Sequence, residues 1–425
     1  MEIHELYQIY LQHPSIVTDT RKILPDSIFF ALKGPKFNGN HFVAQALEKG
    51  AAYCIADEDT GIQDERIIRV TDTLQTLQEL AKNHRLQFKI PFIAITGSNG
   101  KTTTKELVHA VLSSTFKTYT TQGNLNNHIG IPLTLLQIKP DAEIAIIEMG
   151  ANHADEIKGY CQYTMPTHGL ITNCGKAHLE GFGSEEGVRK AKGELFDYLR
   201  IHNGSIFIFN DYEYLLDMSK GIKNKVSYGT NHADYTGIAL DINGMLCVKV
   251  TGGAHLNQVL TQLVGSYNLP NVLAAITIGK TFKVPDEKIK ESLEAYSPGN
   301  SRSQLLHKDG NKIILDAYNA NPSSMKLAIE NFASLPGNNK IVFLGSMMEM
   351  GDASDFEHQA IVDLLLKKQW EYVVLAGPGF KKLPAPFIHF NNSVEAGDWF
   401  KKQNFTARQI LIKGSRSMQM EKILE

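Results

Sequence analysis

A short segment rich in glycine and hydroxyl residues has the side chains and spacing that bind phosphate. The segment Thr96–Thr104 reads TGSNGKTTT, follows the apolar run IPFIAI and precedes KELVHAVL. A strand that passes through a glycine turn into a helix directs free N–H groups at an anion. The pattern Gly97-x-x-Gly100-Lys101-Thr102 is shorter than the common GxxxxGK[ST] form but has the same mechanics. The sequence therefore predicts an ATP-binding loop, although the bare pattern without its flanks would also suit a surface turn.

Each residue type in this loop has a physical task. Gly97 and Gly100 permit backbone angles and a close approach that a side chain would prevent. Lys101 can reach the β- and γ-phosphates, and the Thr102 hydroxyl can coordinate Mg²⁺. The ATP-binding residues predicted in the loop are Thr96, Gly97, Ser98, Asn99, Gly100, Lys101, Thr102 and Thr103.

Two further polar residues follow strand-like runs in the same region. Glu148 closes AEIAIIEMG, and His178 follows HGLITNCGKA. A lone glutamate or histidine after a strand is commonly a solvated loop residue. A magnesium ion that accompanies ATP requires carboxylate oxygens, however, and this favours Glu148 as a metal ligand. For His178 the position alone leaves both readings open.

Lys192 lies in SEEGVRKAKGELF, which predicts a helix with Ser184 as its N-cap. Together with Arg189 and Lys190 it would ordinarily form a solvated basic face. A lysine with a depressed pKa can instead react with CO₂ to give a carbamate that binds metal. The residues themselves do not select between these alternatives.

Polar residues also gather around two strand ends late in the chain. Asp316 could accept hydrogen bonds from ribose hydroxyls, and Arg302 could stabilise phosphate charge during transfer. Capping or surface positions are the alternative for each of them. Their neighbours at these strand ends are Asn319, Asn321, Lys413, Ser415 and Arg416.

The pattern of apolar runs predicts an α/β protein of three domains. Residues 1–86 carry short strands separated by helices and form a small α/β domain. Residues 87–297 begin with the phosphate loop and carry continuous apolar strands, which are typical of a parallel sheet covered on both faces. The turn-rich segment Ser297–Arg302 predicts a linker, and residues 298–425 then form a Rossmann-like, doubly wound domain.

The composition narrows the class of protein. The chain has 425 residues, of which 43% are hydrophobic and 21% charged, with a formal net charge of −2. This balance gives no electrostatic reason to expect a nucleic-acid partner. The four cysteines are scattered and are expected to be buried thiols. Neither a signal peptide nor a membrane span is apparent, so we expect a cytoplasmic monomer that does not insert into membranes.

Several longer motifs, taken together and in order, resemble those of the Mur ligase family. They are SIVTDTRKILPDSIFFALKG, ITGSNGKTTTKEL, QGNLNNHIGIPLTLL, EMGANHADEI, TNCGKAHLEGFGSEEGVRKAKGELF, DAYNANPSSM, FLGSMMEMG and LIKGSR. The phosphate loop alone indicates only the family. NNHIGIPLTLL and DAYNANPSSM favour the branch that adds D-alanyl-D-alanine.

The resemblance implies roles for individual residues. Lys101 and Thr102 match phosphate and Mg²⁺ contacts, while Glu148 and His178 match metal-binding positions. Lys192 matches the lysine that the family carbamylates, which reverses the reading from composition. The implied metal-binding set is Thr102, Glu148, His178 and Lys192, and the implied catalytic set is Lys101, His178, Lys192 and Arg302.

Nucleotide and substrate contacts follow from the same resemblance. Asn268 matches an adenine-contacting asparagine, and Tyr267 stands where many relatives have histidine. Arg302 and Asp316 match residues that close on the ATP phosphates and ribose. The implied substrate-binding residues are Thr20, Arg21, Asn38, Gly39, His41, Asn126, Asn127, Asn319 and Asn321.

The implied reaction is an ATP-dependent ligation that uses about two Mg²⁺ ions. It joins D-alanyl-D-alanine to a UDP-N-acetylmuramoyl-tripeptide through an acyl phosphate. Such a ligase would serve peptidoglycan precursor synthesis, and with it cell wall biogenesis, cell shape and cell division. The first domain would bind the uridine nucleotide. Whether the third residue of the tripeptide is diaminopimelate or lysine stays open.

Three alternative functions are disfavoured by the sequence. The ligase that adds the third residue carries a DNPR motif in its diaminopimelate-specific forms, and that motif is absent from this sequence. Folylpolyglutamate synthetase lacks a first domain of this type. A nucleotide-binding regulator that has lost ligation is disfavoured by the intact set Lys101, Glu148, His178, Lys192 and Arg302.

Overall fold

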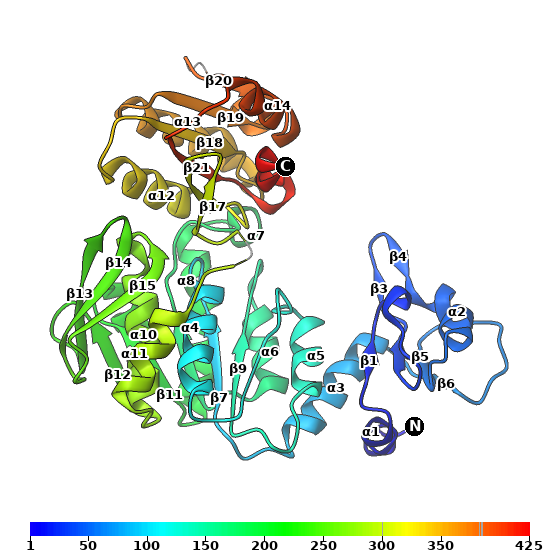
Figure 1. The fold of residues 1–425 in the computed structure, drawn as a ribbon. Coiled ribbons are helices and arrows are strands. Elements are labelled where there is room, and N and C mark those ends of the chain that lie inside the picture. The colour runs from blue at the N-terminus through cyan, green and yellow to red at the C-terminus, as the bar shows by residue number, and fades with distance from the viewer. Residues whose placement is uncertain (300, 382, 384–385) are drawn as a thin grey trace. The chain divides into compact units, whose positions relative to one another are not determined.

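The computed structural model describes residues 1–299, 301–381, 383 and 386–425. The chain separates into two compact units. The first unit comprises Met1–Ala94, Lys117–Ala151 and Asp155–His168. The second comprises Ile95–Phe116, Asn152–Ala154 and Gly169–Glu425. Figure 1 shows the elements of both units, coloured along the chain.

The first unit begins with a small sheet of four parallel strands in the order β1-β2-β5-β6. The apolar runs predicted as strands become its members, because both faces of the central strands are buried. The strands are β1 (Ile16–Val17), β2 (Ile28–Phe30), β5 (Tyr53–Ala56) and β6 (Ile67–Arg69). The helices are α1 (Ile3–Gln12), α2 (Val43–Glu48) and α3 (Thr73–Arg85). A hairpin is formed by β3 (Lys33–Gly34) and β4 (Phe37–Asn38).

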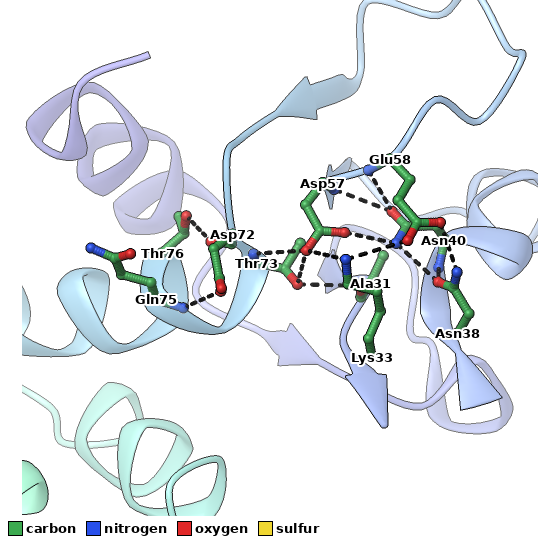
Figure 2. Close-up of polar contacts among 10 residues, drawn as sticks. All are labelled: Ala31, Lys33, Asn38, Asn40, Asp57, Glu58, Asp72, Thr73, Gln75 and Thr76. Atoms are coloured by element: carbon green, nitrogen blue, oxygen red, sulfur yellow. Dashed lines mark hydrogen bonds and ion pairs between the residues drawn. The ribbon is translucent and has the colours of Figure 1, made fainter. Parts of the chain in front are cut away.

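A buried asparagine ties this hairpin to the sheet, as Figure 2 shows. The side chain of Asn40 is 4% exposed, and its Nδ2 donates to Asp57 Oδ1 at 2.8 Å and to Asn38 Oδ1 at 3.0 Å. Its Oδ1 accepts from the backbone N–H groups of Asp57 and Glu58. Asn40 therefore uses both its donor and its acceptor groups inside the domain.

The Asp57 carboxylate extends the same network to helix α3. Its Oδ2 accepts from the N–H and the hydroxyl of Thr73, and lies 3.3 Å from Lys33 Nζ. Burial disfavours the charged carboxylate, but the hydrogen bonds from Asn40, Thr73 and Lys33 leave the pKa of Asp57 below its ordinary value. Asp72 next to it caps α3 by accepting from Gln75 N at 2.8 Å.

The rest of the first unit carries parallel strands and their helices. Strands β8 and β9 pair in parallel, and the Glu148 carboxyl lies at the end of β9. Strand β7 crosses the boundary between the units at Ala94 and Ile95. The elements are β7 (Phe92–Thr96), β8 (Thr118–Thr120), α5 (Gly130–Leu136), β9 (Ile144–Glu148) and α6 (Glu156–Thr164).

The second unit contains strands in the order β15-β14-β13-β12-β11-β10, followed by the end of β7. β11 and β12 are parallel, as the apolar runs predict, but β13 to β15 form an antiparallel meander that the sequence analysis did not foresee. The turn Asn243-Gly244, with φ of +58° and +85°, is the sequence signal for its first hairpin. The strands are β10 (His168–Ile171), β11 (Ser205–Phe209), β12 (Asn224–Gly229), β13 (Tyr235–Ile242), β14 (Met245–Gly252) and β15 (Gln258–Val264).

The helices of this region include the one that follows the phosphate loop and the one that carries Lys192. Ser184 caps the latter by accepting from Gly187 N at 3.1 Å, as predicted. The helices are α4 (Lys101–Ser113), α7 (Leu179–Phe182), α8 (Glu185–Ile201), α9 (Glu213–Met218), α10 (Leu269–Thr281) and α11 (Asp286–Ala295). Asn300 of the expected linker lies outside the described residues.

The carboxyl-terminal part of the second unit is a six-stranded sheet in the order β16-β17-β21-β18-β19-β20. All its pairings are parallel except that of β16 with β17, so the predicted doubly wound sheet gains an antiparallel edge strand. The strands are β16 (Gln304–Lys308), β17 (Asn311–Asp316), β18 (Lys340–Gly345), β19 (Tyr372–Ala376), β20 (Ile388–Phe390) and β21 (Gln409–Lys413). The helices are α12 (Pro322–Ser334), α13 (Ser354–Leu366) and α14 (Ser393–Gln403).

Alternate residues of the central strands enter two separate cores, which explains the continuous apolar runs. In β18, Val342 and Leu344 pack with α12 and α13, whereas Ile341 and Phe343 face the opposite core with Ala396 of α14. A sheet with helices on both faces buries both sets of side chains. The expected doubly wound domain is confirmed (Figure 1).

All four cysteines are free and buried, as expected. Within the described part of the chain, no helix has the length and apolar character required to cross a membrane.

We expect Asn40→Ala to destabilise the first domain by about 2–4 kcal/mol, because the change removes the donor to Asp57 Oδ1 and the acceptor for two backbone N–H groups. Hydrogen–deuterium exchange of β5 and β6 in the full chain should report this loss as faster exchange. His41→Ala is the matched control, since His41 is exposed in the same turn. Equal protection in the two variants would contradict the role of Asn40.

Candidate active site

The predicted phosphate loop joins β7 to α4, and neither of its glycines has room for a side chain. Gly97 has φ +141°, and a Cβ there would lie 2.0 Å from Thr172 Oγ1. Gly100 has φ +79° and is the N-cap of α4; its Cβ would lie 2.7 Å from Asn271 Oδ1. The two glycines are required by close packing as well as by backbone angle.

The end of the neighbouring strand β10 fixes the path of this loop. Asn173 accepts from Ser98 N at 2.8 Å through its carbonyl and from Asn99 N at 3.1 Å through Oδ1. The Asn99 carbonyl accepts from Thr172 Oγ1 at 2.6 Å and from Asn173 Nδ2 at 3.0 Å. The loop is therefore held in shape by side chains that the sequence analysis did not identify.

The charged and hydroxyl groups of the loop lie where an anion would contact the start of α4. Lys101 Nζ is 2.6 Å from the Gly97 carbonyl and 3.2 Å from that of Ser98. Thr102 is 7% exposed, and Thr103 is half-buried. The ammonium thus lies over the same turn whose helix N-terminus carries partial positive charge.

The predicted adenine contact, Asn268, is held by a residue that the prediction omitted. Asn271 Nδ2 donates to Asn268 Oδ1 at 2.9 Å, and Asn271 Oδ1 accepts from Thr104 Oγ1 at 3.0 Å. Asn268 Nδ2 donates to the Val264 carbonyl at 2.9 Å. Asn271 follows Asn268 by three residues, and this one-turn helical spacing was the available signal.

The carboxyl ends of the C-terminal strands bring another group of predicted residues together. Asp316 Oδ2 lies 2.5 Å from Lys413 Nζ, and Asp316 Oδ1 accepts from Ser303 N at 3.1 Å. Lys413 is 2% exposed, so this is a buried ion pair at adjacent strand ends. The Arg302 guanidinium lies 3.5 Å from the centre of the Tyr318 ring, in cation–π geometry.

Asn321 approaches the phosphate loop, whereas Asn319 is exposed. Asn321 Nδ2 donates to Asn99 Oδ1 at 2.8 Å, and Asn99 Nδ2 lies 3.5 Å from Asn321 Oδ1. Asn321 is also the N-cap of α12, accepting from Ser324 N at 2.9 Å. Asn319 Oδ1 accepts from Ala320 N within its own turn.

The predicted metal residues of the second unit are His178 and Lys192. His178 adopts φ +52°, and its Nδ1 bonds to the Glu349 carboxylate. Lys192 lies in α8 and is 1% exposed, with Nζ 4.9 Å from the Phe182 ring centre. Burial of Lys192 excludes the solvated basic face that composition alone would favour.

In the first unit, Glu148 is 1% exposed at the end of β9. Asn126 Nδ2 donates to its Oε1 at 2.7 Å, so two predicted residues are in contact here. Asn127 has a structural task, because its Oδ1 accepts from Ile129 N and Gly130 N at the start of α5.

The remaining candidates of the first domain have mixed surroundings. Arg21 is exposed and forms a bidentate pair with Asp19, whose pKa it lowers to about 2. Thr20 offers its carbonyl to Lys49 Nζ. Asn38 and Gly39 are committed to internal contacts: a Cβ on Gly39 would lie 2.6 Å from the Leu32 carbonyl oxygen. His41 is exposed.

Two of the three donors below offer the oxygen atoms that Mg²⁺ prefers as ligands. Glu148 offers a carboxylate, Thr102 a hydroxyl and His178 an imidazole nitrogen. Among the residues that the structure describes, no three His, Cys, Asp or Glu side chains are gathered into a metal-binding group. The predicted set contains only two residues of these types, Glu148 and His178. The absence of a group of three therefore does not contradict the set, which stays a prediction.

The glycine loop between β7 and α4 forms a candidate anion site, and the same unit contains a doubly wound sheet. Together these features define a phosphate-binding α/β protein of the P-loop class. Comparison with known families narrows this class. The descriptions that match are the Mur ligase middle domain over residues 95–279, the Mur ligase, glutamate ligase domain over 301–402, and the Mur ligase family, catalytic domain over 14–85.

Known proteins are similar over nearly the whole chain. The UDP-N-acetylmuramoyl-tripeptide--D-alanyl-D-alanine ligases of Bacillus subtilis and Escherichia coli are 35% and 33% identical, each over 96% of this chain and 92% of its own length. MurF from Acinetobacter baumannii superposes with a TM-score of 0.86 at 27% identity, covering 98% of this chain and 97% of that one. MurF ligase from Thermotoga maritima in complex with ADP gives 0.87 at 25% identity and covers 97% of both chains. The chain belongs to the Mur ligase family.

We expect Gly100→Ala to weaken ADP binding about tenfold or more, because Ala in a left-handed conformation costs roughly 1–2 kcal/mol and its Cβ would displace Asn271. Isothermal titration calorimetry with ADP measures the change. Gly123→Ala is the matched control: Gly123 also has positive φ, at +55°, but nothing lies within 4 Å of a Cβ there. An ADP affinity that is equal in Gly100→Ala and in the unmutated chain would contradict the packing argument.

Proposed function

We propose that this chain is an ATP-dependent ligase that joins the amine of D-alanyl-D-alanine to the free carboxylate of a UDP-N-acetylmuramoyl-tripeptide. ADP and phosphate are the other products. The observation that carries the proposal is the contact of Asn321, in DAYNANP, with Asn99 of the phosphate loop. The phosphate loop and the DAYNANP motif therefore meet at one place. The names of the relatives described above support the same reaction.

The chemistry follows from the weakness of a carboxylate as an electrophile. Transfer of the γ-phosphoryl group gives an acyl phosphate, which the dipeptide amine then attacks with loss of phosphate. Two anions must meet in the first step, so positive charge beside the phosphates is essential. Lys101 supplies such a charge over the loop, and Arg302 supplies a second. Mg²⁺, when bound by Thr102, Glu148, His178 and a carbamylated Lys192, supplies further charge neutralisation.

The other residues bind and orient the substrates. Asn268, held by Asn271, binds adenine, and Asp316, held by Lys413, binds ribose. Residues 1–86 form the uridine-binding domain, residues 87–297 the ATP domain and residues 298–425 the ligase domain. The first two supply the substrate contacts Thr20, Arg21, Asn38, Gly39, His41, Asn126 and Asn127, and the third Asn319 and Asn321. We place the reaction in the cytoplasm, where ATP is available, and assign it to a monomer.

Phosphate release is expected to require ATP, Mg²⁺ and a UDP-linked tripeptide, and to yield the amide product only when D-alanyl-D-alanine is added. A coupled phosphate assay with mass detection of the product measures both. Lys101→Ala is the control for loop chemistry and should lower turnover about 10²–10³-fold or more while the protein stays folded.

Three outcomes would contradict this proposal. Faster ligation of free diaminopimelate or lysine to a UDP-dipeptide would favour the ligase that adds the third residue. ATP hydrolysis without either peptide substrate would favour a regulator. Near-normal turnover in folded Lys101→Ala would remove the ATP-ligase mechanism itself.

Carbamylation of Lys192 is part of the proposal, and its complete burial in α8 supports it. The amine nitrogen bonds to the carbon of CO₂ and releases a proton, which leaves an anionic carbamate with two oxygen donors.

Lys192→Ala is expected to be nearly inactive and partly rescued by acetate, whereas Lys192→Arg should not recover because it stays cationic. A carbamate signal in ¹³C NMR of the full chain in ¹³CO₂-bicarbonate buffer, lost in both variants, gives a readout independent of turnover. Wild-type activity of Lys192→Ala in CO₂-depleted buffer would falsify the assignment.

A further inference from the structure

Two residues with unusual backbone angles meet in the second unit. His178 and Glu349 adopt φ of +52° and +61°, a left-handed conformation that is uncommon outside glycine. The Glu349 carboxylate accepts a hydrogen bond from His178 Nδ1. The backbone carbonyl of Glu349 accepts a second one from Glu180 N at 3.3 Å. Side chain and backbone of Glu349 therefore both contact the segment that begins at His178. Strained residues of this kind persist where the surrounding structure holds them, commonly at functional sites.

The surroundings hold both partners firmly. On one side, Lys176, two residues before His178, is anchored to α12 and α13. Its backbone N–H donates to Ser323 Oγ of α12, and its Nζ lies 2.7 Å from the carboxylate of buried Glu357 in α13. Leu179 packs against the hydrophobic core of the C-terminal sheet.

On the other side, the loop after β18 that carries Glu349 is fixed at two backbone N–H groups. Met347 N donates to His358 Nε2, and Met348 N donates to Ser415 Oγ, each at 2.9 Å. The carboxylate therefore reaches His178 from a rigid support and not from a free loop.

A hydrogen bond at one ring nitrogen decides what the other nitrogen can do. A carboxylate has no proton to donate, so Nδ1 must carry the proton in the pair with Glu349. In the neutral imidazole, Nε2 is then left with its lone pair. A carboxylate on the distal nitrogen also raises the basicity of a metal-binding histidine and fixes its ring.

We propose that Glu349 is a positioning residue for His178: it fixes the tautomer with the proton on Nδ1, so that Nε2 can bind a divalent cation. This inference rests on the proposed function in taking His178 as a cation ligand. By this inference the carboxylate of Glu349, in the loop after β18, takes part in cation binding. The phosphate-loop motif alone does not indicate such a role.

A simple surface ion pair is the competing explanation. The Glu349 side chain is 53% exposed and that of His178 is 20% exposed, so Coulomb attraction alone would contribute little. An ion pair requires a doubly protonated imidazolium, whereas positioning requires a neutral ring, and these two states differ in their nitrogen spectra.

The first test measures the tautomer in the full nucleotide-free chain by long-range ¹H–¹⁵N NMR at pH 8. His178→Gln identifies the ring among the 15 histidines. We expect a protonated Nδ1 and an unprotonated Nε2 in the native chain, retention of this pattern in Glu349→Gln, and a shift toward Nε2–H in Glu349→Ala. Asp352→Asn is the matched control, because it removes an exposed charge three residues away.

The second test measures Mn²⁺ affinity by electron paramagnetic resonance with ADP present. We expect about a 10–100-fold loss in Glu349→Ala, a smaller loss in Glu349→Gln and none in Asp352→Asn. A doubly protonated His178 in the native chain, or a tautomer unchanged in folded Glu349→Ala, would overturn the inference. So would equal Mn²⁺ affinity in Glu349→Ala and Asp352→Asn. None of these results depends on the peptide substrates. Failure of the proposed ligation in the phosphate assay can therefore be distinguished from failure of the positioning role of Glu349.

Discussion

The close contact between the phosphate loop and the end of β10 is the constraint on which the rest of the site depends. Thr172 and Asn173 occupy the space beside Gly97 and bond to the backbone of Ser98 and Asn99. Because this contact leaves no room for a Cβ, the turn has one shape, and the N–H groups at the start of α4 point in one direction. An anion then finds donors already oriented, so little conformational entropy is lost when it binds.

The second α/β domain takes part in this site through the ends of its strands and the start of its helices. In a parallel sheet the carboxyl ends of all strands lie along one edge, and helix N-termini follow them. Asp316 and Lys413 meet at adjacent strand ends, and Asn321 begins α12 with its amide on Asn99. Glu349 follows β18 in the same manner. One topological rule therefore explains why residues far apart in sequence gather here.

Several predicted substrate residues prove to carry structural tasks, and this limits what residue type can reveal. Asn127 accepts from two backbone N–H groups at the start of α5, Asn38 bonds to Asn40 and Glu58, and Gly39 is packed against the backbone. An asparagine that holds the backbone and one that binds a ligand use the same amide groups, so a single sequence does not distinguish them. Their surroundings in the folded domain do.

The sequence by itself determined the class of fold, the phosphate loop and most of the strands, because hydrophobic period and glycine spacing are local properties of the chain. It also carried a turn signal at Asn243-Gly244 for the antiparallel hairpin that was missed. Only the tertiary structure decided that Lys192 is buried and that Glu349 reaches His178. The latter contact joins groups 171 positions apart in the chain. Strand order and helix packing set such distances, and no local pattern records them.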